Sequence, residues 1–155
     1  MLIAPLFMVA QHAINWEKKK AVFLEIGGSG GIGSLNFEKY FFRKKSTQFT
    51  WRAGLSLAPI DKNNGTGIVC PLMINALIGK ASHKLELGIG QGITVTTKGQ
   101  FFALTTGAIG YRYQAETKKW FYRITYTPLI SYLVDFQMQH WGGISIGYNL
   151  NCKTK

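Results

Sequence analysis

Apolar and polar residues alternate along most of this chain. In residues 84–97 (KLELGIGQGITVTT), almost every second position from Leu85 to Val95 is apolar, and the positions between are Gly, Thr or charged. A period of two is typical of a β-strand with two unlike faces. The same alternation recurs at 49–57, 120–131 and 144–150. We therefore expect an all-β protein.

Polar turns divide the chain into segments of about ten residues, a length typical of membrane-barrel strands. The expected strands are 20–29, 31–42, 47–57, 67–79, 83–97, 100–113, 119–133 and 140–150. The first boundary falls in IGGSGGIGS, which is either a hairpin tip or a bend within one long strand. A bacterial membrane barrel needs an even strand number, so we expect a hairpin there. The prediction is a closed antiparallel up-and-down transmembrane β-barrel of eight strands, one domain over residues 20–150.

The chemistry of the two strand faces distinguishes a membrane barrel from a soluble one. A soluble barrel buries its large apolar side chains and exposes its polar face to water. Here the polar face is mostly Gly, Ser and Thr, which suits a narrow lumen better than a water-facing surface. The apolar face is therefore expected to meet lipid. The alternative is a soluble lipocalin-like barrel whose apolar residues line a pocket for a small hydrophobic ligand.

Aromatic residues are abundant, with ten Phe, seven Tyr and four Trp. With the N-terminus in the periplasm, the expected periplasmic turns are RKKSTQ (43–48), KASHK (80–84) and QAETKK (114–119), and the expected outer loops are APIDKNNGTG (58–67) and LVDFQMQ (133–139). Four aromatic residues surround the turn at 114–119 and two more lie at similar depth, as in the aromatic girdle of a membrane barrel. The expected girdle comprises Phe41, Tyr111, Tyr113, Trp120, Tyr122 and Tyr148. Aromatic pairs between the strands of a soluble sheet are the alternative interpretation.

The formal net charge of +11 raises the possibility of nucleic-acid binding. Most Lys and Arg residues, however, fall in the turns and termini at one expected end of the barrel, the periplasmic one. They are Lys18, Lys19, Lys20, Arg43, Lys44, Lys45, Lys80, Lys84, Lys118, Lys119, Lys153 and Lys155. These bases are not interleaved with aromatic stacking platforms. We expect no nucleic-acid partner.

Along each strand, odd- and even-numbered positions point to opposite faces, and we call the set that shares a face a parity. Six charged residues belong to the polar parity of their strands and are expected to point into the lumen. They are Glu25, Glu38, Glu86, Arg52, Arg112 and Arg123. An eight-stranded barrel is barely wide enough for its own side chains, and buried charges must pair. We therefore expect a structural salt-bridge network that plugs the lumen. The alternative is that the same charged groups have a functional role, as a proton path or as a small catalytic constellation.

Some small outer-membrane barrels are lipid-modifying enzymes, and His140 with Ser131 or Asp135 could form a triad near the outer leaflet. No Gly-x-Ser-x-Gly elbow accompanies these residues. The glycine-rich segment 28–33 lacks the following amphipathic helix that a phosphate site needs. The two cysteines have no metal-ligand spacing. We expect no enzymatic activity, cofactor or metal.

The chain has no run of 18 apolar residues that could form a transmembrane helix. Residues 1–13 begin with the apolar stretch MLIAPLFMVA, which we interpret as a truncated signal peptide or an N-terminal extension. Residues 151–155 (NCKTK) form a short basic tail.

The segments LEIGGSGGIGSLNFEKYF, PLMINALIGKASHKLELGIG, GYRY (110–113), FYRITYTPLI and GGISIGYNL carry a family resemblance. Over residues 20–150 the chain resembles the small β-barrel outer-membrane proteins of Gram-negative bacteria, which generally have no assigned function. The resemblance implies an outer-membrane barrel. From the inverted polarity of the strands we expect an integral outer-membrane protein with a structural or accessory role, membrane lipid as its partner and other outer-membrane proteins as further candidates. The resemblance implies no catalytic residues. The chain departs from the family in ending on NCKTK, where such barrels often end on an aromatic residue.

Overall fold

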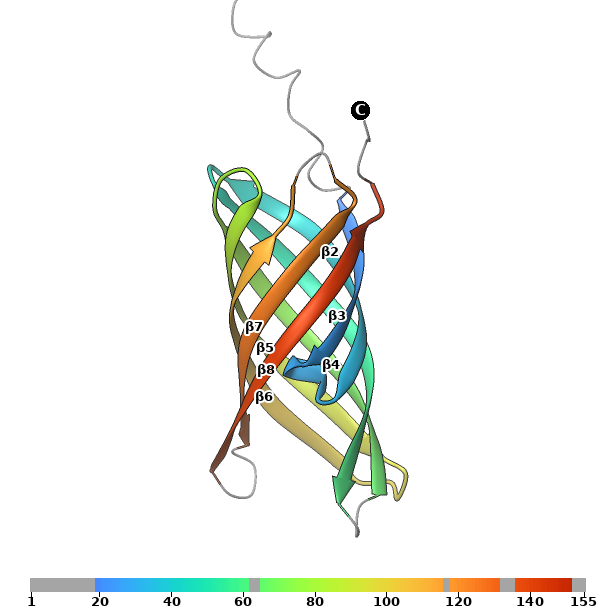
Figure 1. Ribbon diagram of the computed structural model, residues 1–155. Helices are drawn as coiled ribbons and strands as arrows, with labels where there is room; N and C mark the ends of the chain where they lie inside the picture. The colour runs from blue at the N-terminus through green and yellow to red at the C-terminus, as the bar shows by residue number, and fades with distance from the viewer. Residues whose placement is uncertain (1–18, 62–64, 116–117, 132–135, 152–155) are drawn as a thin grey trace, which may run out of the picture.

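The computed structural model describes residues 19–61, 65–115, 118–131 and 136–151. They form the closed antiparallel barrel of eight strands that the sequence predicts (Figure 1). The strands are β1 (Lys20–Gly27), β2 (Gly33–Lys44), β3 (Thr47–Asp61), β4 (Gly65–Ile78), β5 (His83–Thr96), β6 (Phe101–Tyr113), β7 (Trp120–Ser131) and β8 (Gln137–Asn149). The expected signal peptide or extension, residues 1–13, and all but the first residue of the tail at 151–155 lie outside the described ranges.

Each strand pairs with its neighbour in the sequence, and β1 pairs with β8 to close the barrel. That last seam runs from Ala21 opposite Asn149 to Gly27 opposite Gly143. Closure leaves no free sheet edge along this seam, so backbone N–H and C=O groups are paired within the wall. Within the described ranges, no helix is long and apolar enough to cross a membrane.

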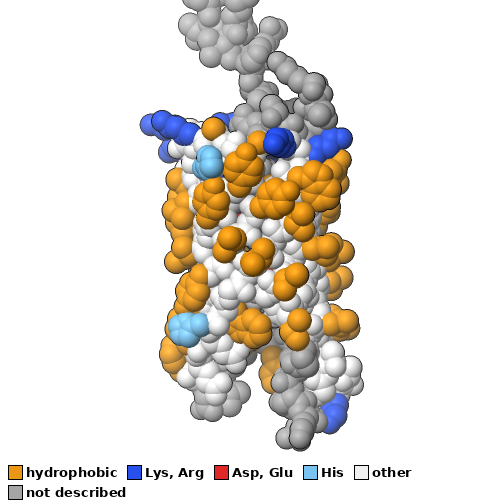
Figure 2. Space-filling view, viewed as in Figure 1, with side chains coloured by type: hydrophobic (Ala, Val, Ile, Leu, Met, Phe, Trp, Pro, Cys, Tyr) orange, Lys and Arg blue, Asp and Glu red, His pale blue; other side chains and the backbone are white. Residues whose placement is uncertain are grey.

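The polarity of the barrel is inverted relative to a soluble protein. Large apolar side chains project outward and stay exposed, including Ile26 at 74% and Ile144 at 66%. The interior instead holds mainly polar and charged side chains, such as Thr50, Asn75, Thr106 and Thr127. Figure 2 shows hydrophobic side chains over the viewed wall and Lys and Arg side chains concentrated at its upper rim. The apolar side chains that alternate along the strands therefore form the outer surface of the barrel.

The segment IGGSGGIGS forms a hairpin between β1 and β2, which resolves the first strand boundary as predicted. Its tip is a short 3₁₀ turn, η3 (Gly28–Gly30), whose three residues are buried. Gly27, Gly28 and Gly31 have φ values of 74°, 77° and 84°, a region that favours glycine. These glycines let the chain fold into the barrel, so that the hairpin ends at mid-height while the neighbouring hairpins continue (Figure 1).

Two expected outer loops are shorter than the sequence suggested. We expected loops at residues 58–67 (APIDKNNGTG) and 133–139 (LVDFQMQ), but β3 continues to Asp61 and β8 begins at Gln137. Paired backbone hydrogen bonds extend the ladders to Asp61 opposite Gly65 and to Ser131 opposite Gln137. Strand pairing outweighs the loop-like composition of these segments.

Candidate functional site: the charged lumen

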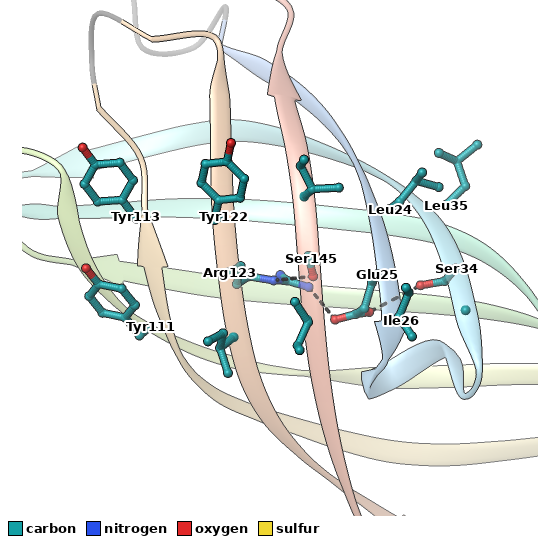
Figure 3. Close-up of a pocket in the computed structure, with 14 residues that line it drawn as sticks. Leu24, Glu25, Ile26, Ser34, Leu35, Tyr111, Tyr113, Tyr122, Arg123 and Ser145 are labelled. Atoms are coloured by element: carbon teal, nitrogen blue, oxygen red, sulfur yellow. Dashed lines mark hydrogen bonds and ion pairs between the residues drawn. The ribbon is translucent and has the colours of Figure 1, made fainter.

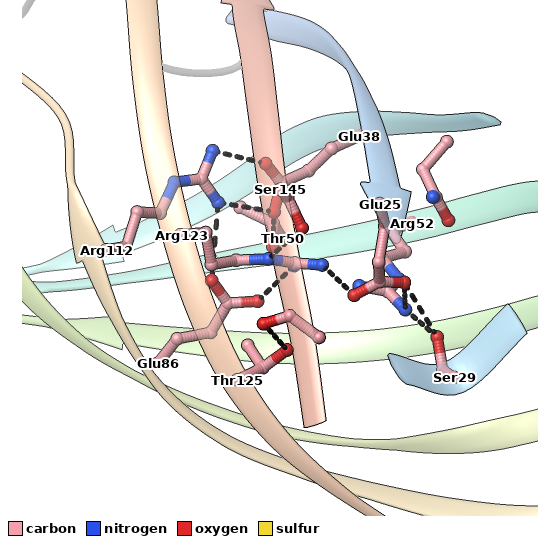
Figure 4. A network of polar contacts seen from close by, with 12 residues as sticks. Glu25, Ser29, Glu38, Thr50, Arg52, Glu86, Arg112, Arg123, Thr125 and Ser145 are labelled. Carbon is pink, nitrogen blue, oxygen red and sulfur yellow. Dashed lines mark hydrogen bonds and ion pairs between the residues drawn. The ribbon is translucent and has the colours of Figure 1, made fainter. Parts of the chain in front are cut away.

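The structure places all six charged residues of the expected lumen network inside the barrel. They are Glu25 on β1, Glu38 on β2, Arg52 on β3, Glu86 on β5, Arg112 on β6 and Arg123 on β7. None of these side chains is more than 2% exposed. Because neighbouring positions on a strand point to opposite faces, the parity that turns apolar residues outward turns these charges inward. Figure 4 shows them converging from different walls of the barrel.

The six groups form one chain in which arginines and glutamates alternate. Arg52 lies 3.2 Å from Glu25, and Arg123 lies 2.5 Å from Glu25 on the other side. Arg123 also pairs with Glu86 at 2.8 Å, and Glu86 lies 3.6 Å from Arg112. Arg112 reaches Glu38 at 2.7 Å. Each interior member of the chain thus touches two groups of opposite charge, which compensates the cost of burying it.

The contact between Arg112 and Glu38 crosses the whole lumen. These residues lie on β6 and β2, which are four strands apart in a closed barrel of eight and therefore face each other. Two nitrogens of Arg112 donate to the two carboxylate oxygens of Glu38 at 3.0 and 2.7 Å. Glu38 accepts a third hydrogen bond from Thr50 at 2.8 Å. The bidentate geometry is the strong, directional form of an arginine–carboxylate pair.

A layer of neutral polar groups continues the network from Arg112. The hydroxyl of Tyr40 accepts from Arg112 at 3.3 Å and donates to Gln114 at 2.9 Å. Gln114 donates in turn to Asn149 at 2.7 Å, and Asn149 donates to the backbone of Lys119 at 3.0 Å. Hydrogen bonds therefore run from the centre of the lumen to the turn between β6 and β7.

Two buried aromatic rings, which the sequence reasoning did not single out, pack against the arginines. Phe23 and Phe121 meet edge to face with centroids 6.0 Å apart. The guanidinium of Arg112 lies 4.0 Å from the centroid of Phe121, and that of Arg123 lies 4.4 Å from Phe23. Such cation–π contacts strengthen when water is excluded. The signal was available, because Phe23 shares the parity of Glu25 and Phe121 shares that of Arg123.

The buried tip of the first hairpin also belongs to the site. Arg52 donates to the hydroxyl of Ser29, and Ser29 donates to Glu25 at 3.4 Å. Ser56 on β3 holds the tip through the backbone oxygen of Gly30 at 2.5 Å. Sequence reasoning recognised the hairpin but missed Ser29, because composition does not reveal that a turn folds inward. The tip covers the Arg52 end of the ion-pair chain (Figure 4).

The expected girdle residues all point away from the lumen. Phe41, Tyr111, Trp120 and Tyr122 are exposed, whereas Tyr113 and Tyr148 are half-buried. Trp120 packs edge to face on Tyr148 with centroids 5.2 Å apart. In Figure 3, Tyr111, Tyr113 and Tyr122 lie along neighbouring strands beside aliphatic side chains. Together they border a hollow of about 610 Å³ on the outer wall, whose other outward lining residues are Leu24, Ile26, Leu35, Ile124, Ile144 and Ile146.

Of the candidate triad, the structure describes His140 and Ser131, and it places their side chains on opposite faces of the sheet. His140 shares the outward parity of Met138 and Ile144, and its Nδ1 lies 2.5 Å from the hydroxyl of Tyr126. Ser131 belongs to the inward-facing parity of β7 and lies three residues after Pro128, which pairs with His140. Asp135 lies outside the described residues. Among the residues that the structure describes, no three His, Cys, Asp or Glu side chains gather as metal ligands.

Comparison with known proteins adds support for the fold. No protein-family model matches the chain, and no curated protein matches it. Among solved structures, the chain is similar to the N-terminal β-barrel domain of OprF from Pseudomonas aeruginosa, with a TM-score of 0.58. The match covers 85% of this chain and 96% of that domain at 11% sequence identity. The likeness therefore concerns the barrel architecture.

Proposed function

We propose that this protein is an integral barrel of the bacterial outer membrane whose lumen is sealed by ion pairs, and that it serves as a structural or accessory membrane component. One observation carries the proposal: exposed Ile, Leu, Tyr, Trp and Phe side chains cover the outside of a barrel that buries its charges. Contiguous apolar surface on this scale is unfavourable in water and favourable in lipid. The similarity to the OprF barrel supports the same architecture.

The sealed lumen rests on the route of the ion-pair chain. Arg112 and Glu38 join opposite walls, and Phe121 and Phe23 fill space beside the arginines. A permeating ion would have to break buried pairs, each costing several kcal/mol. The proposal includes membrane lipid as partner, with other outer-membrane proteins as further candidates. It assigns no enzymatic activity, cofactor or nucleic-acid partner.

A ligand-carrying soluble barrel finds no support in this geometry. Such a protein needs the apolar parity inside, around a pocket. Here Leu85, Leu87 and Ile89 of that parity are exposed on β5, while Glu86 between them is fully buried. The interior available to a hydrophobic ligand is instead occupied by charged groups.

Membrane fractionation tests the location. The chain is expressed in a Gram-negative host behind a functional secretion signal, and the membranes are separated by density. We expect the protein in the outer-membrane fraction, resistant to carbonate and released by detergent. Recovery from the periplasm in soluble, folded form without detergent would contradict the proposal.

Conductance tests the seal separately. In planar lipid bilayers the parent protein is expected to insert without a steady ion current. A matched comparison is the double variant Glu38→Ala/Arg112→Ala, which removes both ends of the cross-lumen pair and is expected to conduct. A parent protein with steady, open-channel conductance would refute the sealed lumen while leaving the membrane location intact.

A further inference from the structure

A basic pocket of about 550 Å³ lies at the rim of the barrel, between the turn that joins β2 to β3 and the turn that joins β4 to β5. Four of its lining residues are cationic: Arg43, Lys45, Lys80 and Lys84. Ser46, Gln48, Gly79 and Ala81 complete the lining. None of these described lining residues is acidic. The pocket therefore concentrates positive charge in a concave site.

A β-bulge directs one of these cations toward the pocket. The pairing of β2 with β3 shifts register between Tyr40 and Phe42. Before the shift, even-numbered residues such as Glu38 and Tyr40 face inward, whereas after it Arg43 lies opposite the buried Gln48. Without the bulge, Arg43 would continue the outward parity. Bulges commonly re-aim a side chain in this way.

The opposite side of the pocket is held in place by specific contacts. Lys84 on β5 points inward, is 4% exposed and donates to Gln48 at 3.1 Å. The backbone N–H of Gly79 donates to the backbone oxygen of Ser46 at 3.1 Å, which ties the two turns together. The cations thus come from two turns and two strand ends fixed relative to one another, not from one flexible loop.

We propose that this rim pocket is a binding site for a phosphate group. One arginine and three lysines line the pocket, no described lining residue is acidic, and the Ser46 hydroxyl and Gln48 amide offer further donors. Phosphate suits this arrangement because it carries more charge and more acceptor oxygens than a carboxylate. The phosphate can belong to a lipid headgroup at the membrane surface or to a soluble phosphate compound, and the two sources are separable by experiment.

The test uses the full chain, folded in a neutral detergent, titrated with inorganic phosphate by calorimetry at fixed chloride. The pocket variant is Lys45→Gln/Lys80→Gln. The matched control is Lys44→Gln/Lys98→Gln, which removes the same net charge from residues that do not line the pocket. We expect saturable binding by the parent and the control, and about tenfold weaker binding by the pocket variant. The proposal is overturned if calorimetry does not distinguish the two variants and they also show the same lipid preference in the vesicle experiment.

The lipid arm measures contact between the protein and spin-labelled phosphatidylglycerol or phosphatidylcholine in phosphatidylcholine vesicles. If the pocket takes a headgroup, the parent and the control immobilise more phosphatidylglycerol than phosphatidylcholine, and the pocket variant loses this preference. If it takes a soluble phosphate compound, calorimetry separates the variants and the lipid preference does not. Either pattern supports the phosphate site.

A footprint on the parent protein covers the case in which the pocket variant does not fold. Lysines are acylated for a short time with and without phosphate, and the labelled peptides are quantified. We expect phosphate to slow acylation of Lys45 and Lys80 several-fold more than that of Lys44. Equal protection of all three lysines would count against the pocket.

Discussion

Replacing Arg112 with Met removes the charge that joins the two walls of the lumen. Arg112 is fully buried, donates twice to Glu38 and lies 3.6 Å from Glu86. Methionine keeps much of the packing against Phe121 but leaves Glu38 with Thr50 as its remaining hydrogen-bond partner among the described residues. Breaking one side of a buried pair costs about 3–5 kcal/mol, whereas an exposed pair contributes about 0–1 kcal/mol.

Urea unfolding in detergent measures this loss. With a denaturant dependence of about 2 kcal/mol per M, the midpoint of Arg112→Met should fall by roughly 1.5–2.5 M. Arg43→Met is the matched control, because it makes the same substitution at an exposed arginine and should leave the midpoint nearly unchanged. A midpoint for Arg112→Met equal to that of the parent would refute the argument for a buried, paired arginine.

A second substitution identifies the partner of Arg112. Adding Glu38→Gln to Arg112→Met should recover part of the stability, because it neutralises the carboxylate that lost its bidentate donor. Adding Glu86→Gln should recover less, because Glu86 still has Arg123 at 2.8 Å. Greater recovery with Glu86→Gln would show that the network is arranged differently.

Two further substitutions probe the packing of the lumen. Gly147→Ala should lower the free energy of unfolding by about 1–3 kcal/mol, because the added Cβ would lie 2.1 Å from the Phe121 ring, whereas Gly142→Ala meets its nearest neighbour at 4.0 Å and should be nearly neutral in the same urea assay. Ser29→Ala should cost about 1–3 kcal/mol by thermal or urea unfolding, because Arg52 and Glu25 each lose a buried hydrogen-bond partner. Parent-like stability of Gly147→Ala or of Ser29→Ala would contradict the corresponding contact.

The alternation of residues was sufficient to predict the barrel and the direction of its side chains. Leu85, Glu86 and Leu87 already show the inverted polarity, because a period of two fixes which positions share a face. Alternation cannot report where pairing continues through loop-like sequence, as it does around Asp61 and Gln137. It also cannot foresee the register shift after Tyr40, which reverses the parity at Arg43.

The partners within the lumen were beyond sequence reasoning for a different reason. Parity places Arg112 inward, but its partner depends on the stagger of the strands around the barrel. That stagger brings Glu38 from the opposite wall closer to Arg112 than Glu86 on the adjacent strand. Phe23 and Phe121 share the inward-facing positions of their strands, but their apolar rings do not by themselves indicate that they pack against buried arginines.

The proposal that the outer, apolar face of the barrel meets lipid is tested most directly by spin-label accessibility. Nitroxides are attached at Ile89→Cys and Ile144→Cys in lipid vesicles, with Cys70 and Cys152 replaced by Ala, and Lys44→Cys and Lys98→Cys report the water-exposed ends. We predict that collisions with oxygen dominate at positions 89 and 144, and that collisions with a water-soluble nickel chelate dominate at 44 and 98. Nickel-dominated collisions at positions 89 and 144 would contradict the account, because this face of the barrel would then meet water.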